Sequence, residues 1–249
     1  MWLYGSGNDG LPPIRLYEYQ PGRGGYHAEE FLKGFSGYLT CDGFSGYNKL
    51  KKVIHCGCLA HMRRYWYDAL PGKTKTASEK TPAEIGFDYC NQLFKLEEKY
   101  AGLDADTRKA KRLETEPAIW EAYWSWLETV NPTGGSRLEK AVTYARNQKP
   151  YMENYLLDGR CSISNNIAEN IARPYAVGRK NFLFHDTVKG ARSSAIIYSL
   201  VETAKFNNLN IYAYLETVLL YMPDYKNEPE GIEELMPWSD MIQQRCRIE

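Results

Sequence analysis

Residues 37–43, with the sequence Gly-Tyr-Leu-Thr-Cys-Asp-Gly, give the clearest indication of fold class in the chain. The run Gly37–Cys41 is apolar and uncharged, which predicts a buried strand that Asp42 and Gly43 bring to an end. A carboxylate that directly follows a buried strand is a frequent metal ligand at the edge of an α/β sheet. A plain Asp-Gly turn explains the same dipeptide, and the dipeptide alone favours that simpler interpretation.

The sequence on either side predicts short strands alternating with helices. Strands are expected at Trp2–Tyr4, Ile14–Tyr19 and Val53–Cys56, because these runs are rich in apolar, aromatic and β-branched residues. The last of them is expected to be buried. A helix is expected over Leu59–Leu70, where apolar residues recur at spacings of three and four. Residues 1–70 therefore predict an α/β fold class, and compact elements return over residues 151–222, so we expect these two parts to form one split domain.

Residues 71–150 have a different pattern. Pro82–Tyr100 and Asp106–Val130 are long, charged and amphipathic, with Pro117 expected to kink or split the second helix. This block has no strand pattern, so we interpret it as a helical insertion. Residues 223–249 form an acidic C-terminal tail, since Pro223–Asp240 holds six acidic residues against one lysine, a net charge of −5.

Composition excludes several classes of protein. The 249 residues are 43% hydrophobic and 25% charged, which allows a sizeable core and argues against disorder. Lys+Arg and Asp+Glu both number 31, so net charge indicates no partner. No apolar run is long enough for a membrane span, and the first residues do not resemble a signal peptide. Six cysteines without an export signal predict reduced thiols in the cytoplasm.

Glu169 is the second candidate acid. On a helix over residues 165–173, Asn166, Glu169, Asn170 and Arg173 share one face, because their spacings are three and four. Two amides, a carboxylate and a guanidinium on one face could hold a metal ion and a phosphate. A solvated polar face with a weak Glu–Arg pair explains the same pattern, and the pattern alone favours it.

Residues 171–192 are strongly basic. Five basic residues stand against the single Asp186, a net charge of +4, and aromatic residues lie between them. The basic residues are Arg173, Arg179, Lys180, Lys189 and Arg192. Cations mixed with aromatic rings suit a phosphate backbone and exposed bases, although an ordinary exposed loop can have the same composition. Arg63 and Arg64 are expected to extend this basic surface.

The cluster of His55, Cys56, Cys58 and His61 has the residue types of a zinc site. All four lie within seven residues, whereas a closed tetrahedral site usually takes its ligands as two pairs from separate segments. We therefore favour a buried thiol and a histidine at a helix start over a metal site.

Several strings together resemble transposases of the insertion sequence 66 family. Residues 34–48 resemble the segment around that family's second catalytic aspartate, and Cys58–Arg64 resembles its Cys-x-Ala-His-x-Arg-Arg signature. Residues 165–170 and 178–184 resemble the segment around the catalytic glutamate. Residues 199–205 and 234–238 resemble C-terminal motifs of the family. The strings occur in the family's order over nearly the whole chain, which makes the set far more specific than any one string.

The resemblance implies a ribonuclease H-like catalytic core with a mixed sheet, interrupted by a large helical insertion. It implies metal-dependent DNA cleavage and strand transfer at insertion-sequence ends by a DDE set of two aspartates and a glutamate. These acids hold two divalent ions, Mg²⁺ by expectation with Mn²⁺ as an alternative. Asp42 matches the second acid and Glu169 the third, as catalytic and metal-binding residues. The residues expected to bind DNA are Asn166, Asn170, Arg173, Arg179, Lys180, Arg63 and Arg64.

One part of the family pattern has no match. The family's first aspartate lies on a central strand that precedes the segment resembled by Trp2–Tyr4, and Asp9 is a poor replacement because it sits in a turn. We therefore expect a C-terminal part of a catalytic region that lacks its central strand and is inactive alone. The alternatives are a non-catalytic regulator that binds DNA or a transposase, and a subunit completed by self-association or by a separately encoded N-terminal part. The expected location is the bacterial cytoplasm, on the nucleoid when DNA is bound.

Overall fold

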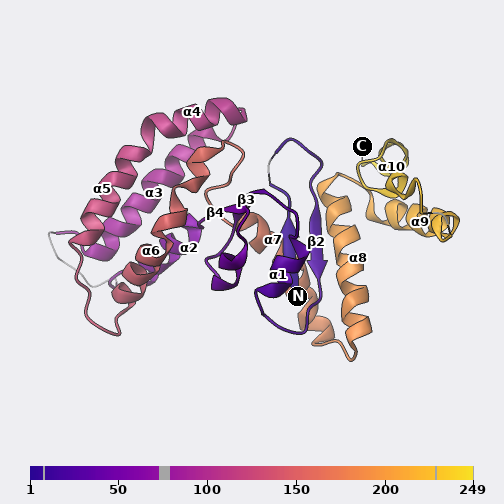
Figure 1. The fold of residues 1–249 in the computed structure, drawn as a ribbon, viewed down its shortest axis with the longest axis horizontal. Coiled ribbons are helices and arrows are strands. Elements are labelled where there is room, and N and C mark those ends of the chain that lie inside the picture. Colours follow the sequence, from indigo (N-terminus) through magenta and orange to yellow (C-terminus); the bar gives the residue numbers. More distant parts are fainter. Residues whose placement is uncertain (8, 73–78, 228, 249) are drawn as a thin grey trace. The chain divides into compact units, whose positions relative to one another are not determined.

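The computed structural model describes residues 1–7, 9–72, 79–227 and 229–248. They form two compact units, one of Met1–Gly22 with Ile167–Glu249 and the other of Arg23–Asn166. Each unit is considered by itself (Figure 1). Glu228 of the acidic tail and residues 73–78 at the start of the expected insertion lie outside the described residues.

The first unit combines a two-stranded antiparallel sheet with helices from the C-terminal part of the chain. Strands β1 (Trp2–Gly5) and β2 (Arg15–Glu18) pair with Leu3 opposite Tyr17. The helices are α7 (Asn166–Phe182), whose first residue falls at the unit boundary, α8 (Val188–Phe206), α9 (Ile211–Tyr221) and α10 (Asp240–Cys246). Two short 3₁₀ helices, Met222–Tyr225 and Ile232–Leu235, connect α9 to α10.

Helix α8 covers the outer edge of β2 with hydroxyl groups. Thr203 Oγ1 accepts from the Arg15 N–H at 3.1 Å and donates to the Arg15 carbonyl at 2.9 Å. One turn earlier, Ser199 Oγ accepts from the Tyr17 N–H at 2.9 Å. The spacing works because residues four apart on a helix rise about 6 Å, close to the step between alternate strand residues. These hydroxyl groups satisfy backbone groups for which a third strand would be the usual partner.

The second unit contains a small parallel sheet and a helical block. Strands β3 (Gly37–Thr40) and β4 (Val53–Cys56) pair in parallel, with Thr40 opposite Cys56. Short helix α1 (Tyr26–Phe31) precedes them and a 3₁₀ helix, Ser45–Lys49, connects them. The longer helices are α2 (Leu59–Asp68), α3 (Pro82–Tyr100), α4 (Ala105–Thr115), α5 (Pro117–Glu128) and α6 (Arg137–Met152), with a 3₁₀ helix at Asn154–Leu157.

Aromatic side chains dominate the core of this helical block. Trp66 and Trp120 are completely buried, and Trp66 Nε1 donates to the Tyr123 hydroxyl at 3.2 Å, which satisfies a polar atom inside an apolar core. Helix α3 approaches α2 closely because position 86 is glycine, where an added Cβ would press into the Trp66 indole ring. Local signals define the helix ends, since Thr81 and Glu84 form a capping box and Pro117 begins α5.

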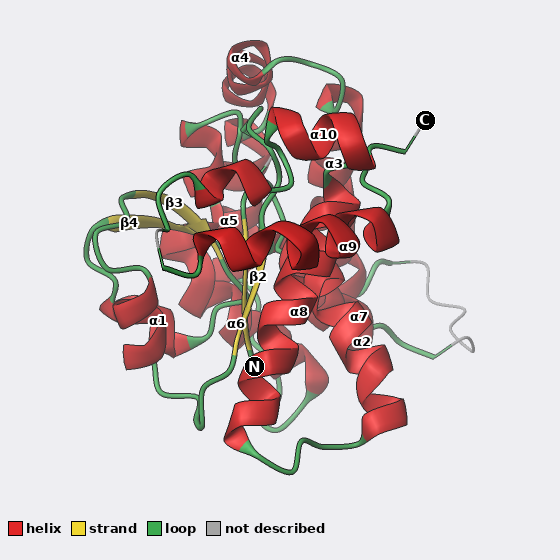
Figure 2. Ribbon diagram, turned by 90° about the vertical axis from the view of Figure 1, so that its right-hand side faces the viewer, coloured by secondary structure: helices red, strands yellow, loops and turns green. Residues whose placement is uncertain are grey.

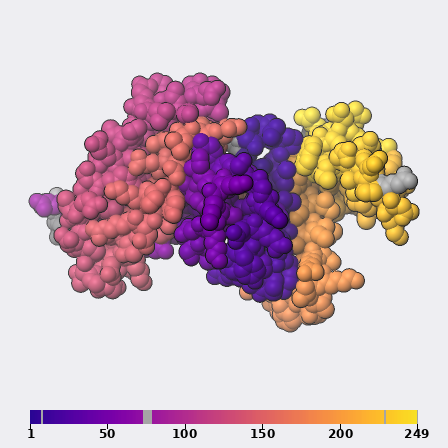
Figure 3. Space-filling model, in the orientation of Figure 1, coloured from indigo at the N-terminus to yellow at the C-terminus, as the bar shows by residue number. Residues whose placement is uncertain are grey.

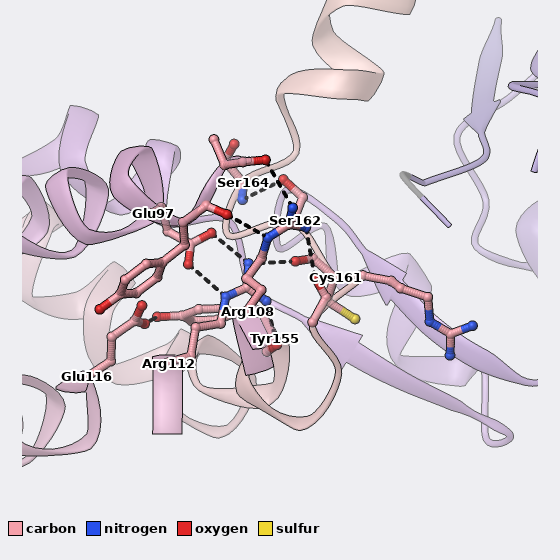
Figure 4. A network of polar contacts seen from close by, with 12 residues as sticks. Glu97, Arg108, Arg112, Glu116, Tyr155, Cys161, Ser162 and Ser164 are labelled. Carbon is pink, nitrogen blue, oxygen red and sulfur yellow. Dashed lines mark hydrogen bonds and ion pairs between the residues drawn. The ribbon is translucent and has the colours of Figure 1, made fainter. Parts of the chain in front are cut away.

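A buried ion pair joins α3 and α4 to the segment that follows α6 (Figure 4). Arg112 is 1% exposed and donates to both carboxylate oxygens of Glu97, at 2.7 and 2.6 Å. The same guanidinium donates to the carbonyls of Tyr155 at 3.2 Å and Cys161 at 3.0 Å. Neighbouring Glu116 is fully buried and accepts from the Tyr155 hydroxyl. The contact between α3 and α4 is therefore polar and largely buried.

The observed fold is rich in helices, with small sheets, consistent with the predicted α/β class (Figure 2). Strands occur where predicted, and Pro117 separates two helices as expected. The prediction that Gly37–Cys41 and Val53–Cys56 are buried strands is wrong in its burial, because β3 is half-buried throughout and in β4 only Cys56 is buried. A sheet of two strands leaves much of its surface partly uncovered. Helix α7 also continues through Pro174 to Phe182, beyond the expected end at residue 173.

Candidate functional site

Asp42 lies in the turn directly after β3. Its Oδ1 accepts a hydrogen bond from the Phe44 N–H at 3.1 Å, and Gly43 has φ +82°. This is the Asp-Gly turn that the dipeptide predicts, with one carboxylate oxygen used inside the turn. Asp42 is exposed, so its other carboxylate oxygen remains open to a ligand. The structural role and a ligand-binding role are therefore compatible at this residue.

The groups around Asp42 are protonated at neutral pH. Burial raises the pKa of the Cys41 thiol to about 11. Burial, reinforced by the negative charge of Asp42, raises the pKa of Tyr47 to about 12. Burial likewise raises the pKa of Tyr144, whose hydroxyl donates to the Asp42 main-chain carbonyl at 3.4 Å. Asp42 thus faces neutral neighbours, which leaves its negative charge available to a cation.

Glu169 lies in the first turn of α7, and its Oε1 is buried although its neighbours on the same face are exposed. The buried side of this helix is marked by Ile171, whose carbonyl accepts from the Tyr17 hydroxyl at 2.5 Å. Asn166, Asn170 and Arg173 are exposed, and Glu169 is half-buried. The predicted polar face therefore exists. An acid in the first turn also stabilises the helix through its dipole, which is a structural reason for the residue.

The cations of the basic segment, residues 171–192, lie on helices, whereas the sequence also allowed an exposed loop there. Arg179 and Lys180 lie in the last turn of α7, and Lys189 and Arg192 lie in the first turns of α8. All four side chains are exposed. Cations at a helix C-terminus are favourable for the helix itself, which accounts for Arg179 and Lys180 in part. The same positions leave their charges free to meet an anionic partner.

The arginines of the Cys58–Arg64 string differ in their surroundings. Arg63 Nε donates to Asn91 Oδ1 at 2.6 Å, and its guanidinium lies over the Phe87 ring, 4.6 Å from the centroid. Arg64 lines a groove of about 830 Å³ along α2 and α3, together with Lys95 and Tyr67. Asp88 and Glu98 line the same groove, so its charge is mixed. Arg63 thus has a structural role in joining α2 to α3.

The groove residues on α3 were not anticipated from the sequence. Lys95 and Tyr67 belong to ordinary amphipathic helices, and only their packing brings them to the same groove as Arg64. The charged face of α3 could have indicated a surface site, but it did not indicate which helix would lie beside it. A DNA-binding role for Arg63 and Arg64 stays a prediction.

The donor groups of the described residues do not gather into a metal site. Among residues 1–7, 9–72, 79–227 and 229–248, no group of three His, Cys, Asp or Glu side chains could hold a metal ion. Asp42 belongs to the unit Arg23–Asn166, and Glu169 belongs to the other unit. The acids present do not make a three-carboxylate site, so we derive no catalytic step through a metal. Their convergence on shared ions stays a prediction.

Three residues of the suggested zinc cluster, Cys56, Cys58 and His55, are buried or hydrogen-bonded within the protein. Cys56 and Cys58 are fully buried, and Cys58 Sγ accepts from the Asn165 N–H at 3.2 Å. Cys58 stands at the N-cap position of α2. His55 lies on β4, with its Nε2 3.3 Å from the Leu50 carbonyl oxygen. Each of these three residues has an evident structural role in holding the turn region that follows β3 and β4.

Comparison with known proteins identifies the family. Residues 1–193 match the family described as "Transposase IS66 family", and residues 199–238 match the "IS66 C-terminal element". The two matches cover Asp42, Glu169 and the basic segment, and confirm the resemblance seen in the sequence. The chain belongs to the IS66 transposase family.

Three proteins of Sinorhizobium fredii are similar to the chain. The uncharacterized protein y4qI is 32% identical over 96% of this chain and 46% of its own length. The uncharacterized proteins y4hP and y4jD are 27% and 28% identical, over 91% and 92% of this chain and 44% and 46% of their own lengths. The chain therefore spans less than half the length of these relatives. No solved structure matches the chain, and no helix among its described residues is long and apolar enough to cross a membrane.

Proposed function

We propose that this chain is the C-terminal part of the catalytic region of a DDE transposase that cuts and joins DNA at insertion-sequence ends. The observation that carries the proposal is the family match, which spans nearly the whole chain and includes both candidate acids. In this proposal residues 1–70 and 151–222 belong to a ribonuclease H-like core, residues 71–150 are the helical insertion and residues 223–249 form a C-terminal tail.

Asp42 and Glu169 are proposed as the second and third acids of the catalytic set, each binding a divalent ion, Mg²⁺ or Mn²⁺. Support comes from the exposed carboxylate of Asp42 after β3 and from the position of Glu169 beside the exposed amides of Asn166 and Asn170 on α7. The first acid of such a set, an aspartate in the family, has no counterpart among the motifs of this chain. Because its relatives are more than twice as long as the matched region, we propose that a longer polypeptide or a second chain supplies it.

The remaining candidates are proposed to contact DNA. Asn166, Asn170 and Arg173 share the exposed face of α7, and Arg179 and Lys180 continue the positive charge toward its end. Exposed cations of this kind bind phosphates through counterion release, which gives affinity without reading sequence. The chain would act in the bacterial cytoplasm, on the nucleoid while DNA is bound.

A strand-transfer assay tests the catalytic proposal. The purified chain, Mg²⁺ and duplexes from the two ends of the encoding element are expected to give no joined product. A preparation completed by an N-terminal part with an aspartate-bearing strand is expected to be active. In that preparation D42N and E169Q should abolish joining, while D186N, at an exposed acid, should not. Joining by the chain alone would contradict the expected inactivity, and full activity of D42N would contradict the acid assignment.

A non-catalytic regulator that binds DNA is the second candidate function. The exposed cations of α7 and α8 favour it, since they need no catalytic acid to bind phosphate. Filter binding of end duplexes over a range of salt concentrations tests it. Affinity that falls as salt rises is expected, and affinity independent of salt would contradict phosphate contact. Co-expression with an upstream N-terminal part tests the alternative that two chains assemble, because failure to co-purify would count against a completed enzyme.

A further inference from the structure

The turn between α7 and α8 has an unusual backbone at its tip. Leu183 has φ +58°, in the left-handed region that favours glycine, and it follows directly after the last residue of α7. Its N–H still donates to the Arg179 carbonyl at 2.8 Å, and the Phe184 N–H donates to the Phe182 carbonyl at 2.7 Å. A large side chain held in a strained conformation at a surface turn calls for a functional explanation.

The two side chains at this tip are highly exposed. Leu183 is 64% exposed and Phe184 is 70% exposed, although both are large and apolar. Single exposed apolar residues are common, but adjacent ones on a protruding turn form a small apolar contact surface. Figure 1 shows the turn at the end of the α7–α8 pair, and Figure 3 shows its orange atoms open to solvent.

The base of the turn is held firmly. The His185 ring stacks on Phe182 with centroids 4.9 Å apart, and its Nε2 lies 3.0 Å from the Tyr175 hydroxyl. Tyr175 in turn packs edge-on against Tyr198 of α8, with centroids 5.3 Å apart. The residues on either side of the tip are thus fixed to both helices. Beside this fixed base, the side chains of Leu183 and Phe184 are exposed to solvent.

The charge around the tip indicates what it contacts. Arg179 and Lys180 precede it and Lys189 and Arg192 follow it, against the single acid Asp186. An apolar tip ringed by exposed cations is poorly suited to another copy of the same basic surface, because like charges repel. It suits DNA, which offers phosphates to the cations and base faces to the apolar side chains.

We propose that Leu183 and Phe184 form a stacking wedge that inserts against an unpaired or unstacked DNA base, while the surrounding cations hold the adjacent phosphates. The inference rests on the proposed DNA-binding function and adds to it the part of DNA that is recognised. Phe184 supplies the ring face for stacking, and Leu183 fills the space beside the displaced base.

Fluorescence anisotropy with the full chain tests the wedge. Two labelled duplexes of equal length and sequence are compared, one fully paired and one with a short internal bubble of unpaired bases. The wild-type chain is expected to prefer the bubble. F184A is expected to lose about tenfold or more of its affinity for the bubble and little for the paired duplex. F184W should retain the preference, because it keeps a ring face.

Matched variants separate the effect of base stacking on DNA binding from the effects of charge and of unfolding. V177A removes an exposed apolar side chain on α7 away from the tip and should change nothing. K180A should weaken binding to both duplexes alike and reduce the salt dependence by about one ion. A 2-aminopurine in the bubble gives a second readout, since its fluorescence should change on binding wild type and much less on binding F184A. Unchanged circular dichroism and thermal melting of F184A would show that the loss is not unfolding.

The failure modes are distinguishable. If the wild type binds neither duplex in a salt-dependent manner, the proposed DNA-binding function fails and the wedge with it. If K180A weakens binding while F184A binds the bubble as wild type does, only the wedge is overturned. Equal losses of F184A on both duplexes, or a fall in its self-association with no change in DNA binding, would also overturn the wedge, the latter in favour of a protein contact.

Discussion

Each of the two units contains a buried arginine, and the two are stabilised in different ways. In the unit Arg23–Asn166, Arg112 is paired through two hydrogen bonds with Glu97 and also donates to main-chain carbonyls. In the other unit, Arg15 is 6% exposed, donates to the carbonyls of Ser6 and Ile14, and lies over the Phe206 ring. Burial lowers the pKa of Arg15, since carbonyl dipoles and a ring compensate less than a carboxylate does.

The same difference extends to the apolar packing of the two units. The unit Arg23–Asn166 has one large core cluster that includes Trp66, Trp120 and Tyr123. The other unit has two smaller clusters, around Tyr214 and around Tyr17, and leaves Leu183, Phe184 and many other apolar residues exposed. One unit therefore has a single large apolar core, whereas the other has smaller clusters and leaves more of its large apolar side chains exposed.

Breaking the Arg112 pair should have the largest effect on stability. Arg112→Ala leaves Glu97 without its cation and several buried carbonyls without donors, so the free energy of unfolding should fall by about 3–5 kcal/mol. Urea denaturation measures this. The control is Lys111→Ala, which removes an exposed pair with Glu114 on the same helix and should cost at most about 1 kcal/mol. Equal losses in both variants would contradict the distinction between buried and exposed pairs.

The next effect concerns pH and the buried acid Glu116. Burial raises its pKa from the usual range to about 7, so the folded chain holds a proton that the unfolded chain releases near pH 4.5. The stabilisation linked to this proton is complete below pH 4.5 and is lost as pH rises through 7. Glu116→Gln should therefore gain about 3 kcal/mol over wild type at pH 8 and little at pH 4.5.

Thermal and urea unfolding of wild type and Glu116→Gln across this pH window would measure the difference. Glu114→Gln, at an exposed acid two residues earlier in α4, serves as the control and should run parallel to wild type. A constant gap between Glu116→Gln and wild type at all pH values would contradict the raised pKa.

A third test addresses the hydroxyl contacts of α8 with β2 in the other unit. Thr203→Val keeps the shape of the side chain but leaves the Arg15 N–H and carbonyl without partners, which should cost about 1–3 kcal/mol. Hydrogen exchange at the Arg15 amide should speed up more than exchange in α3. Ser193→Ala, at an exposed position of α8, should leave both quantities unchanged. Unaltered exchange in Thr203→Val would show that the hydroxyl is dispensable.

The smallest expected effect has the opposite sign. Leu183→Gly removes the side chain that opposes a positive φ, so the free energy of unfolding should rise by about 0.5–1 kcal/mol, after allowing for the greater freedom of glycine when unfolded. Differential scanning calorimetry would detect this as a higher melting temperature. A lower melting temperature would mean that the Leu183 side chain is held by contacts that outweigh the strain.

The sequence predicted the helices better than their surroundings. Pro117 and the capping residues Thr81 and Glu84 are local signals, so the ends of α3 and α5 could be expected from neighbouring residues alone. The half-exposed state of β3 could not, because burial depends on how many strands join the sheet. The continuation of α7 beyond residue 173 was not predicted either. Pro174 lies inside this helix, which continues on both sides of it.

The residues of the candidate site could be predicted where they belong to a family motif. Asp42 and Glu169 followed from family strings, and the turn after β3 has the expected Asp-Gly form. The groove residue Lys95 was missed because it meets Arg64 only through packing of α2 on α3. The left-handed conformation of Leu183 was equally out of reach, because nothing in a leucine side chain indicates a positive φ.

The pairing of β2 with α8 has a consequence for synthesis on the ribosome. Arg15 and Thr203 are 188 residues apart, so at about 5–20 residues per second the first hairpin emerges about 10–40 seconds before its covering helix. The contiguous unit Arg23–Asn166 can fold during that interval. Until translation reaches α8, the edge of β2 remains open, and this is the period when a nascent chain is most exposed to chaperones or to pairing with a neighbouring polypeptide.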